Sequence, residues 1–252
     1  MNTVIGGKAS KAALFNTIGG WTTQFEIEGQ KVGGTVDLLP KDPRLLWHLE
    51  QIGGADGKYV LELGALEGGH TKMIVEAGAA KVIATEGLND CFLRCLVVKE
   101  AFRLTEARFL FCDFNDYVAD YAILVEGELA YKFDFVSAAG VLYHQKDPVT
   151  LICNLARITD TVIVWSQVAD ATQPAGKEGT VNGYRGKWNN YNGTRLTSAS
   201  YCGGLQNEAF WLYPEEMLEC FADAGFRHIR TGDSPRNVNG ESLLFVASKN
   251  PL

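Results

Sequence analysis

The sequence predicts an α/β protein built on a mostly parallel β-sheet with helices on both faces. From about residue 58 onward, apolar runs of strand length alternate with stretches of helical periodicity, and this pattern is typical of parallel strands joined by helices. Of the 252 residues, 46% are hydrophobic and 21% are charged. That composition is typical of a folded protein with a sizeable core, and it excludes disorder as the main state.

The expected elements follow from the order of these runs. Apolar and β-branched runs predict strands at 59–63, 82–85, 108–112, 133–138 and 161–164, and two shorter strands at 227–231 and 243–247. Helical spacing predicts a helix over 89–105 with Asn89 as its N-cap, a helix that begins at Asp147 and Pro148, and a last helix over 214–224. An aspartate followed by a proline is a common helix start, because the carboxylate accepts hydrogen bonds from free backbone N–H groups.

Two segments lie outside this alternation. Residues 1–57 form an N-terminal extension, with a hairpin that turns at Gly29 and a helix that begins at Asp42 and Pro43. Residues 58–252 form the main domain, and within it residues 166–213 form a cap inserted after the fifth strand. The cap contains a loop rich in glycine and asparagine between 172 and 204, and a loop that long inside a compact domain is usually functional or mobile.

Charge and cysteine usage limit the partners and the compartment. The 30 acidic and 23 basic side chains give a formal net charge of −7, which repels a phosphate backbone and argues against nucleic acid. The apolar runs are shorter than the ~20 residues that cross a bilayer, so no membrane segment is expected. The first twenty residues lack the features of a secretory signal, and the six cysteines form no C-x-x-C motif. We therefore expect a cytoplasmic protein with reduced thiols, whose oligomeric state, a homodimer included, stays open.

A glycine turn follows the first expected strand and leads into a helix. It lies in the run Glu62-Leu63-Gly64-Ala65-Leu66-Glu67-Gly68, and Glu86 ends the next strand 22 residues after Gly64. Glycine lets the backbone approach a ligand closely, and an acid at the end of the second strand can accept both hydroxyls of a ribose. Together with Asp113 at the end of the third strand, these acids predict a nucleoside site at the carboxyl edge of the sheet.

The spacing of the glycines separates the candidate ligands. A dinucleotide site uses G-x-G-x-x-G so that helix amides reach a pyrophosphate, whereas this turn reads G-x-x-x-G and carries Glu62 and Glu67. Two carboxylates suit a cation with a sulfonium and an ammonium group better than an anionic pyrophosphate. An NAD-dependent dehydrogenase stays an alternative, as does a non-catalytic module that binds the ligand without turnover.

These motifs resemble the class I S-adenosylmethionine-dependent methyltransferases over roughly residues 58–250. The resemblance implies a Rossmann-like seven-stranded sheet whose last strand is antiparallel, and S-adenosyl-L-methionine as the cofactor. It also implies that the glycine turn holds the methionine end, that Glu86 binds the ribose, and that the residues after the third and fourth strands hold the adenine and the sulfonium. The cofactor-binding residues that it implies are Glu62, Gly64, Ala65, Gly68, Glu86, Gly87, Asp113, Phe114, Ala139 and Gly140.

A second resemblance concerns the methyl acceptor. The run 140–144 followed by Asp147 and Pro148 is similar to the subgroup that includes the wobble-uridine tRNA carboxymethyltransferases, and the run 207–211 is similar to small-molecule and sugar methyltransferases of that subgroup. It implies methyl transfer to a hydroxyl of a small polar metabolite, with a sugar or natural product as the candidate and tRNA modification as the alternative. His144 lies just beyond the fourth strand and titrates near neutral pH. It is the candidate general base, and a ring that merely caps the loop is the equal alternative.

The cap loop supplies further candidates for binding the acceptor. Aromatic rings stack on a sugar or a flat ring, and cations pair with an anionic group. The expected substrate-binding residues are Tyr143, Tyr184, Arg185, Trp188 and Tyr191. A solvated loop whose rings pack on the sheet edge is the alternative. No metal site is expected, because the run 165–167 after the fifth strand lacks the carboxylates of catechol methyltransferases.

Overall fold

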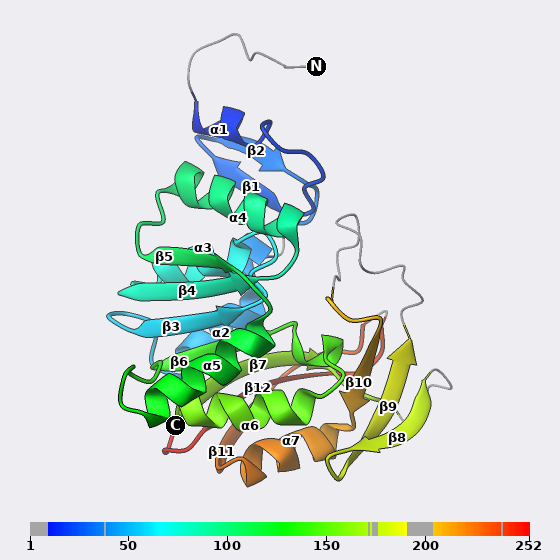
Figure 1. Ribbon diagram of the computed structural model, residues 1–252. Helices are drawn as coiled ribbons and strands as arrows, with labels where there is room; N and C mark the ends of the chain where they lie inside the picture. Colours follow the sequence, from blue (N-terminus) through cyan, green and yellow to red (C-terminus); the bar gives the residue numbers. More distant parts are fainter. Residues whose placement is uncertain (1–9, 38, 171, 173–175, 191–203, 238) are drawn as a thin grey trace.

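The computed structural model of the protein describes residues 10–37, 39–170, 172, 176–190, 204–237 and 239–252. A seven-stranded sheet forms the centre of the molecule, with the spatial order β11-β12-β7-β6-β3-β4-β5 (Figure 1). Neighbouring strands from β7 to β5 are parallel, and β12 runs antiparallel to both β7 and β11. The strands are β3 (Tyr59–Leu63), β4 (Lys81–Glu86), β5 (Ala107–Phe111), β6 (Phe135–Ala139), β7 (Thr161–Gln167), β11 (His228–Gly232) and β12 (Ser242–Ser248). The predicted mostly parallel sheet with a reversed last strand is confirmed.

Helices cover both faces of this sheet, so its strands are buried on two sides. The helices are α2 (Pro43–Gln51), α3 (Gly69–Glu76), α4 (Asn89–Phe102), α5 (Phe114–Glu126), α6 (Pro148–Ile158) and α7 (Pro214–Asp223). Successive strand residues point to opposite faces: Leu61 and Val136 belong to the core under α5, α6 and α7, whereas Val60 and Phe135 belong to the core under α2, α3 and α4. Two buried faces explain why the strands read as continuous apolar runs.

The helix starts agree with the sequence at two places and differ at two others. Asp147 and Asp42 cap α6 and α2 as predicted, and their carboxylates accept the N–H groups of the residues three and two positions on. Asn89 is the first residue of α4 and not its N-cap, because Glu86 accepts the N–H of Leu88 at 2.7 Å and fixes the turn one residue earlier. The helix α5 was not predicted, and Asp113 is its N-cap.

The N-terminal extension contains the predicted hairpin and lies on α4, as the top of Figure 1 shows. It consists of α1 (Lys11–Leu14), β1 (Gln24–Ile27), β2 (Gln30–Gly33) and the 3₁₀ turn η1 (Leu39–Lys41), followed by α2. The hairpin turns through Glu28 and Gly29, both at positive φ, which is the geometry of a two-residue type I′ turn. The Phe15 and Phe25 rings contact the Phe102 ring of α4 at centroid distances of 6.4 and 5.7 Å.

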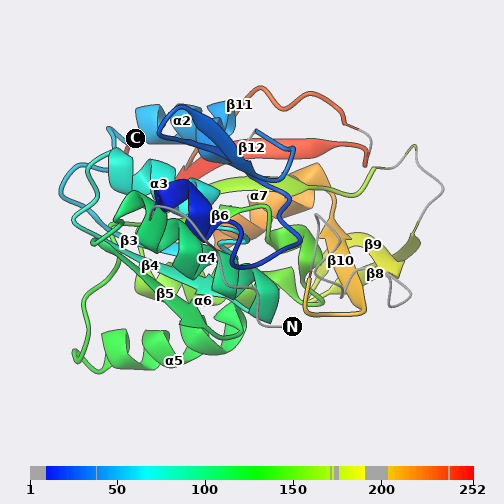
Figure 2. The same cartoon turned by 90° about the horizontal axis from the view of Figure 1, so that it is seen from above.

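The cap is a small antiparallel sheet where the sequence predicts a long loop. Its strands β8 (Lys177–Val181), β9 (Tyr184–Asn190) and β10 (Glu208–Leu212) lie in the order β10-β9-β8 at one end of the molecule (Figures 1 and 2). Asn182 and Gly183 form the β8–β9 turn, both at positive φ. Gly186 of β9 lies against the neighbouring strand, where a Cβ would come within 2.2 Å of the Trp211 carbonyl oxygen. These glycines therefore serve a turn and a close strand contact.

The cap leaves the main domain and rejoins it at neighbouring points. It begins after β7 and ends at α7, and the Ala169 N–H donates to the Leu212 carbonyl oxygen at 2.9 Å. Phe210 and Leu212 of β10 are fully buried in the core under α5, α6 and α7. The cap is thus fixed to the main domain through β10.

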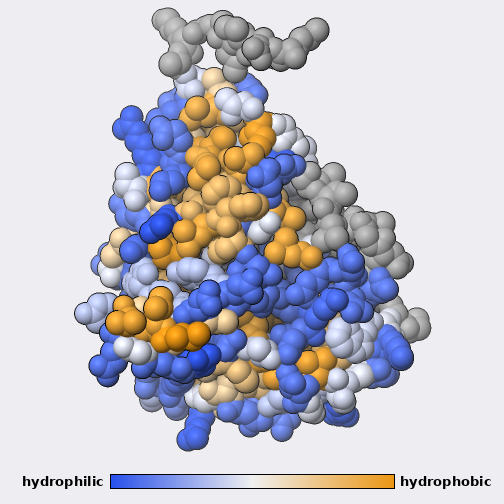
Figure 3. Space-filling model, viewed as in Figure 1, coloured by the Kyte–Doolittle hydropathy of each residue, from blue (hydrophilic) through white to orange (hydrophobic). Residues whose placement is uncertain are grey.

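Apolar side chains also reach the surface on the face seen in Figure 3. Leu93 and Leu96 of α4 and Phe111 of the edge strand β5 are exposed, and the Phe92 ring contacts the Phe111 ring at 5.2 Å.

Among the described helices, none is both long and apolar enough to cross a membrane.

Candidate functional site

A cavity of about 410 Å³ opens at the carboxyl ends of the parallel strands. The connections that follow β3, β4, β5 and β6 line it, together with the last residues of β7, the start of α2, residues 204–206 before β10 and the β11–β12 connection. Ligands of open α/β sheets bind at this edge. The cavity brings together most of the residues predicted from the sequence, namely Glu62, Gly64, Ala65, Glu86, Gly87, Asp113, Phe114, Ala139, Gly140, Tyr143 and His144.

The turn after β3 lines the cavity with Gly64, Ala65 and Leu66, and its backbone conformation depends on positive φ angles. Gly64 has a φ of +65°, and a Cβ there would meet Val141 Cγ1 at 2.9 Å. Leu66 also has a positive φ, of 55°, which is unfavourable for a residue with a Cβ. Its N–H donates to Glu86 Oε2 at 2.7 Å and holds this conformation. Gly68 is the N-cap of α3 at a φ of +77° and does not line the cavity.

Two buried acids line the cavity from neighbouring strands, Glu62 one residue before the end of β3 and Glu86 at the end of β4. Glu86 accepts the N–H groups of Leu66 and Leu88 at 2.7 Å each. Burial raises the pKa of Glu86 to about 7 despite these hydrogen bonds, and the negative charge of Glu62 adds to the shift. Burial likewise raises the pKa of Glu62, which accepts a hydrogen bond from the Thr71 hydroxyl. A ligand that brings a positive charge or hydroxyl donors would stabilise both ionised forms.

The residues after β5 combine a structural contact with a place on the cavity wall. The Asp113 carboxylate accepts the backbone N–H of Asn115 at 2.8 Å and its side-chain amide at 2.9 Å, which caps α5. Asp113 and Phe114 both line the cavity beside the β4 end. They therefore lie together on the cavity wall, and the capping of α5 fixes the direction of the Asp113 side chain.

The connection after β6 leaves open space over the sheet and then carries the candidate base. Gly140 has a φ of +90°, and a Cβ built there would have no neighbour nearer than 3.8 Å. The following turn, η2 (Leu142–His144), buries His144 to 6% exposure on the cavity wall. The His144 and Tyr143 rings contact each other at a centroid distance of 4.2 Å. His144 thus lies on the cavity wall, in the turn that follows β6.

Solved structures share this architecture. The N-terminal domain of EvdMO1, crystallised with S-adenosylhomocysteine bound, is 24% identical and superposes with a TM-score of 0.74 over 94% of each chain. Magnesium protoporphyrin IX methyltransferase from Synechocystis PCC 6803, also with S-adenosylhomocysteine, is 20% identical, with a TM-score of 0.53 over 83% of this chain and 81% of that one. The chain has the class I methyltransferase fold.

Two further comparisons bear on this fold. The 1,6-didemethyltoxoflavin-N1-methyltransferase of Burkholderia thailandensis is 18% identical, with a TM-score of 0.53 over 84% of this chain and 79% of that one. In the crystal structure of EvdMO1 the chain covers 49% of that longer chain, so it is similar to one part of it. No protein-family model and no curated protein sequence matches the chain.

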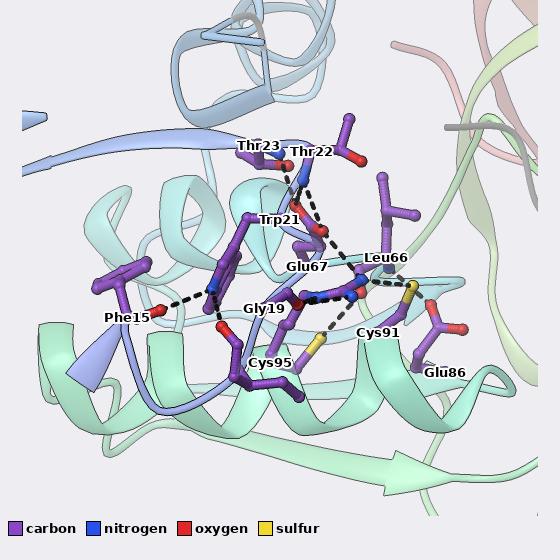
Figure 4. A network of polar contacts seen from close by, with 12 residues as sticks. Phe15, Gly19, Trp21, Thr22, Thr23, Leu66, Glu67, Glu86, Cys91 and Cys95 are labelled. Atoms are coloured by element: carbon purple, nitrogen blue, oxygen red, sulfur yellow. Dashed lines mark hydrogen bonds and ion pairs between the residues drawn. The ribbon is translucent and has the colours of Figure 1, made fainter. Parts of the chain in front are cut away.

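Within this methyltransferase fold, Glu67 does not join Glu62 at the cavity. The Glu67 carboxylate points to the N-terminal extension, where it accepts the N–H groups of Thr22 and Thr23 at 3.0 and 2.6 Å (Figure 4). It also pairs with the buried Arg94 of α4 at 3.3 Å, and Arg94 in turn donates to the Gly19 carbonyl oxygen. The expected pair of Glu62 and Glu67 is therefore not brought together at the cavity, because Glu67 holds the extension against the glycine turn. The second buried acid that lines the cavity is Glu86.

The cap residues expected to bind the acceptor make structural contacts instead. Tyr184 donates to Asp223 of α7 at 2.7 Å, Arg185 pairs with Glu216 of α7 at 2.6 Å, and the Trp188 ring packs on the Phe210 ring at 5.0 Å. None of these three lines the cavity. Their strand faces α7 and the core, so the sheet fixes them away from the site. Tyr191 lies outside the described residues.

A cluster of charged side chains, which the sequence did not predict, lines the cavity at the start of α2 and of α3. Asp42 is fully buried and accepts hydrogen bonds from Arg44 at 2.6 Å and from His70 of α3 at 2.9 Å. Burial raises the pKa of Asp42, but these two partners outweigh it and hold the pKa well below its usual range. The Arg44 guanidinium lies 4.1 Å from the centre of the Trp165 ring at the end of β7. Asp42 was recognised as a helix cap, yet only the packing of α2 over the sheet brings it to the cavity.

Proposed function

We propose that the protein binds S-adenosylmethionine and transfers its methyl group to a hydroxyl of a small polar metabolite. The observation that carries this proposal is the pair Glu62 and Glu86, buried beside the open glycine turn at the carboxyl edge of a methyltransferase fold. Bound S-adenosylmethionine supplies a methyl group that its sulfonium makes electrophilic. The residues present fit that ligand: Gly64 leaves backbone exposed, Glu86 offers oxygens to ribose hydroxyls, and Glu62 offers a negative charge to the cationic end.

What remains for the protein is to place the acceptor, exclude water and remove a proton. His144 lines the cavity together with Tyr143 and Trp165. We assign to His144 the proton that the acceptor hydroxyl loses as its oxygen bonds to the methyl carbon. A hydroxyl is favoured over other acceptor atoms because a histidine base is present.

A small polar acceptor is supported by the size and lining of the site. The cavity of about 410 Å³ has a volume typical of a small-molecule site. One EvdMO1 domain structure, 21% identical to this chain with a TM-score of 0.71, was obtained in the presence of S-adenosylhomocysteine and D-fucose. A sugar is therefore the acceptor class that we propose first. The formal charge of −7 disfavours tRNA.

Calorimetric titration with S-adenosylhomocysteine and with NAD tests the cofactor. We expect binding of the first and none of the second, since the turn lacks the middle glycine of a dinucleotide site. Binding of NAD alone would favour the dehydrogenase. Incubation with radiolabelled S-adenosylmethionine and a panel of sugars and phenols then tests turnover. Binding without transfer to any of them would leave the non-catalytic module.

A further inference from the structure

One buried side chain on the cavity wall has a hydrogen-bonding group without a partner. Gln167, the last residue of β7, is 2% exposed, and its Oε1 atom accepts a hydrogen bond from none of the described residues. A buried amide oxygen without a donor is unfavourable, and folded proteins contain few of them. Because Gln167 also lines the cavity, we read its oxygen as a site for a ligand donor.

The position of Gln167 in the sheet places it in the part of the cavity where we expect the methyl acceptor to bind. Trp165 pairs with Ala139, the last residue of β6, and Gln167 lies two residues further on, opposite Ser242 of β12. The order β12-β7-β6-β3-β4 places it on the side of β6 away from Glu62 and Glu86. A donor that reaches Gln167 therefore belongs to the molecule that receives the methyl group.

A neutral ring lies on the same wall. His48 of α2 is fully buried, and its Nε2 lies 3.0 Å from the Val164 carbonyl oxygen. Burial lowers the pKa of His48 to about 4, so the ring is neutral at pH 7. The Gln167 oxygen therefore carries the inference, because it needs an O–H or N–H group as its donor.

The charges around these atoms select among donors. The Arg44 guanidinium and the buried Asp42 carboxylate line the same cavity and pair with each other at 2.6 Å. Neither an ammonium group nor a carboxylate therefore finds an unpaired opposite charge in that pair. Asn237 and Asn239 of the β11–β12 connection add uncharged amides. Neutral hydroxyl groups on a compact ring satisfy all of these conditions.

We propose that Gln167 determines acceptor specificity: its Oε1 accepts a hydrogen bond from a hydroxyl of a neutral sugar ring and positions that ring for methyl transfer. The inference rests on the proposed function and adds to it the residue that distinguishes neutral sugars from charged or phenolic acceptors. Removing the amide should weaken the binding of the sugar and leave the cofactor site intact. It should also remove an unsatisfied group from the free protein.

The test compares Gln167→Met with Gln145→Met. Gln145 is a matched control, because it is buried too but both ends of its amide have partners, Asn115 and the Val141 carbonyl oxygen. We expect Gln167→Met to melt at or above the wild-type temperature and Gln145→Met to melt several degrees lower. Wild-type protein loaded with S-adenosylhomocysteine should show saturation-transfer NMR signals from D-fucose, and Gln167→Met should bind this sugar at least tenfold more weakly. The affinity of Gln167→Met for S-adenosylhomocysteine should stay within twofold of wild type.

Each other outcome overturns the inference. A lower melting temperature for Gln167→Met with unchanged D-fucose binding would show that the amide has a structural role. The same NMR experiment on wild-type protein loaded with S-adenosylhomocysteine can exclude a neutral sugar as the acceptor. It does so if neither D-fucose nor D-glucose gives a signal, or if glucosamine, glucuronate or catechol binds more tightly than they do. Absence of S-adenosylhomocysteine binding in the wild-type protein would refute the proposed function itself, and calorimetry detects that failure before any sugar is added.

Discussion

At the scale of single residues, buried acids set the electrostatics of the cavity. Glu62 and Glu86 were predictable because each ends a strand, and strand ends can be read from local apolar runs. Asp42, Arg44 and His70 were not, because they come from segments that meet only when α2 packs over the sheet edge. Glu67 was expected at the cavity from its place in the glycine turn. Its neighbour Leu66 does line the cavity, but the Glu67 carboxylate points to the extension.

Glu86 should make cofactor binding depend on pH. Its pKa is raised from 4.5 to about 7, so the free protein holds this proton below pH 7 and releases it above. Hydroxyl donors of a ribose favour the ionised form, so S-adenosylhomocysteine should bind more tightly at pH 8 than at pH 6 and release part of a proton near pH 7. Calorimetry in two buffers of different ionisation enthalpy measures this release. The Glu86→Gln variant should bind S-adenosylhomocysteine at least tenfold more weakly, and its affinity should no longer rise between pH 6 and pH 8. An affinity that still rises with pH as in the wild-type protein would contradict the prediction.

The same shift affects folding. Between pH 4.5 and 7 the folded state binds more protons at Glu86 than the unfolded state, so the free energy of unfolding decreases as pH rises through this window. The full effect of a shift of this size is about 3 kcal/mol. Relative to wild type, Glu86→Gln should therefore gain stability from pH 5 to pH 8. Urea unfolding at the two pH values gives the difference, and a constant difference would argue that Glu86 titrates normally.

His144→Gln tests the base. Loss of a general base slows proton removal by about 10² to 10⁴, so single-turnover methyl transfer should slow by at least 100-fold while S-adenosylhomocysteine affinity stays the same. If His144 only caps its loop, the melting temperature should fall and the rate should not change.

At the scale of elements, regular strands and helices were predictable and the cap was not. The main-domain strands could be read because local apolar runs define them. The sequence does carry a hairpin signal at Asn182 and Gly183, a dipeptide typical of two-residue turns, but the glycine content of the segment suggested a loop. Strand packing explains those glycines, since a Cβ at Gly179 would lie 2.9 Å from the Trp188 ring nitrogen.

The contact between the extension and the glycine turn depends on the buried pair of Glu67 and Arg94, whose side chains are 1% and 3% exposed. Breaking a buried pair leaves an uncompensated charge and costs about 3 to 5 kcal/mol. Glu67→Gln should lose a large part of this amount in urea unfolding and make the extension more sensitive to protease. Glu76→Gln removes the exposed pair with Lys72 and should change stability by less than about 1 kcal/mol. Equal effects of the two substitutions would mean that burial does not distinguish the pairs.

At the scale of the whole molecule, ligand binding should raise the stability of the fold, because the cavity is lined by the ends of five central strands. A ligand at 100 times its Kd adds about 2.7 kcal/mol, which corresponds to roughly 5 to 11 °C in a domain of this size. S-adenosylhomocysteine should produce such a shift in a thermal melt, and NAD at the same concentration should not. No shift with S-adenosylhomocysteine at millimolar concentration would contradict a site at this edge.

The hydrogen bond between Ala169 and Leu212 has a consequence for how such a protein can diversify. The two ends of the cap are hydrogen-bonded to each other, so another small domain of similar size could replace it without a change in the path of the main-domain backbone. Domain insertion and circular permutation are tolerated for the same reason, because the chain ends lie close together. Any graft must retain the apolar anchors Phe210 and Leu212. Exchange of one compact unit would then change residues 204–206, which line the cavity, while the central sheet stays unaltered.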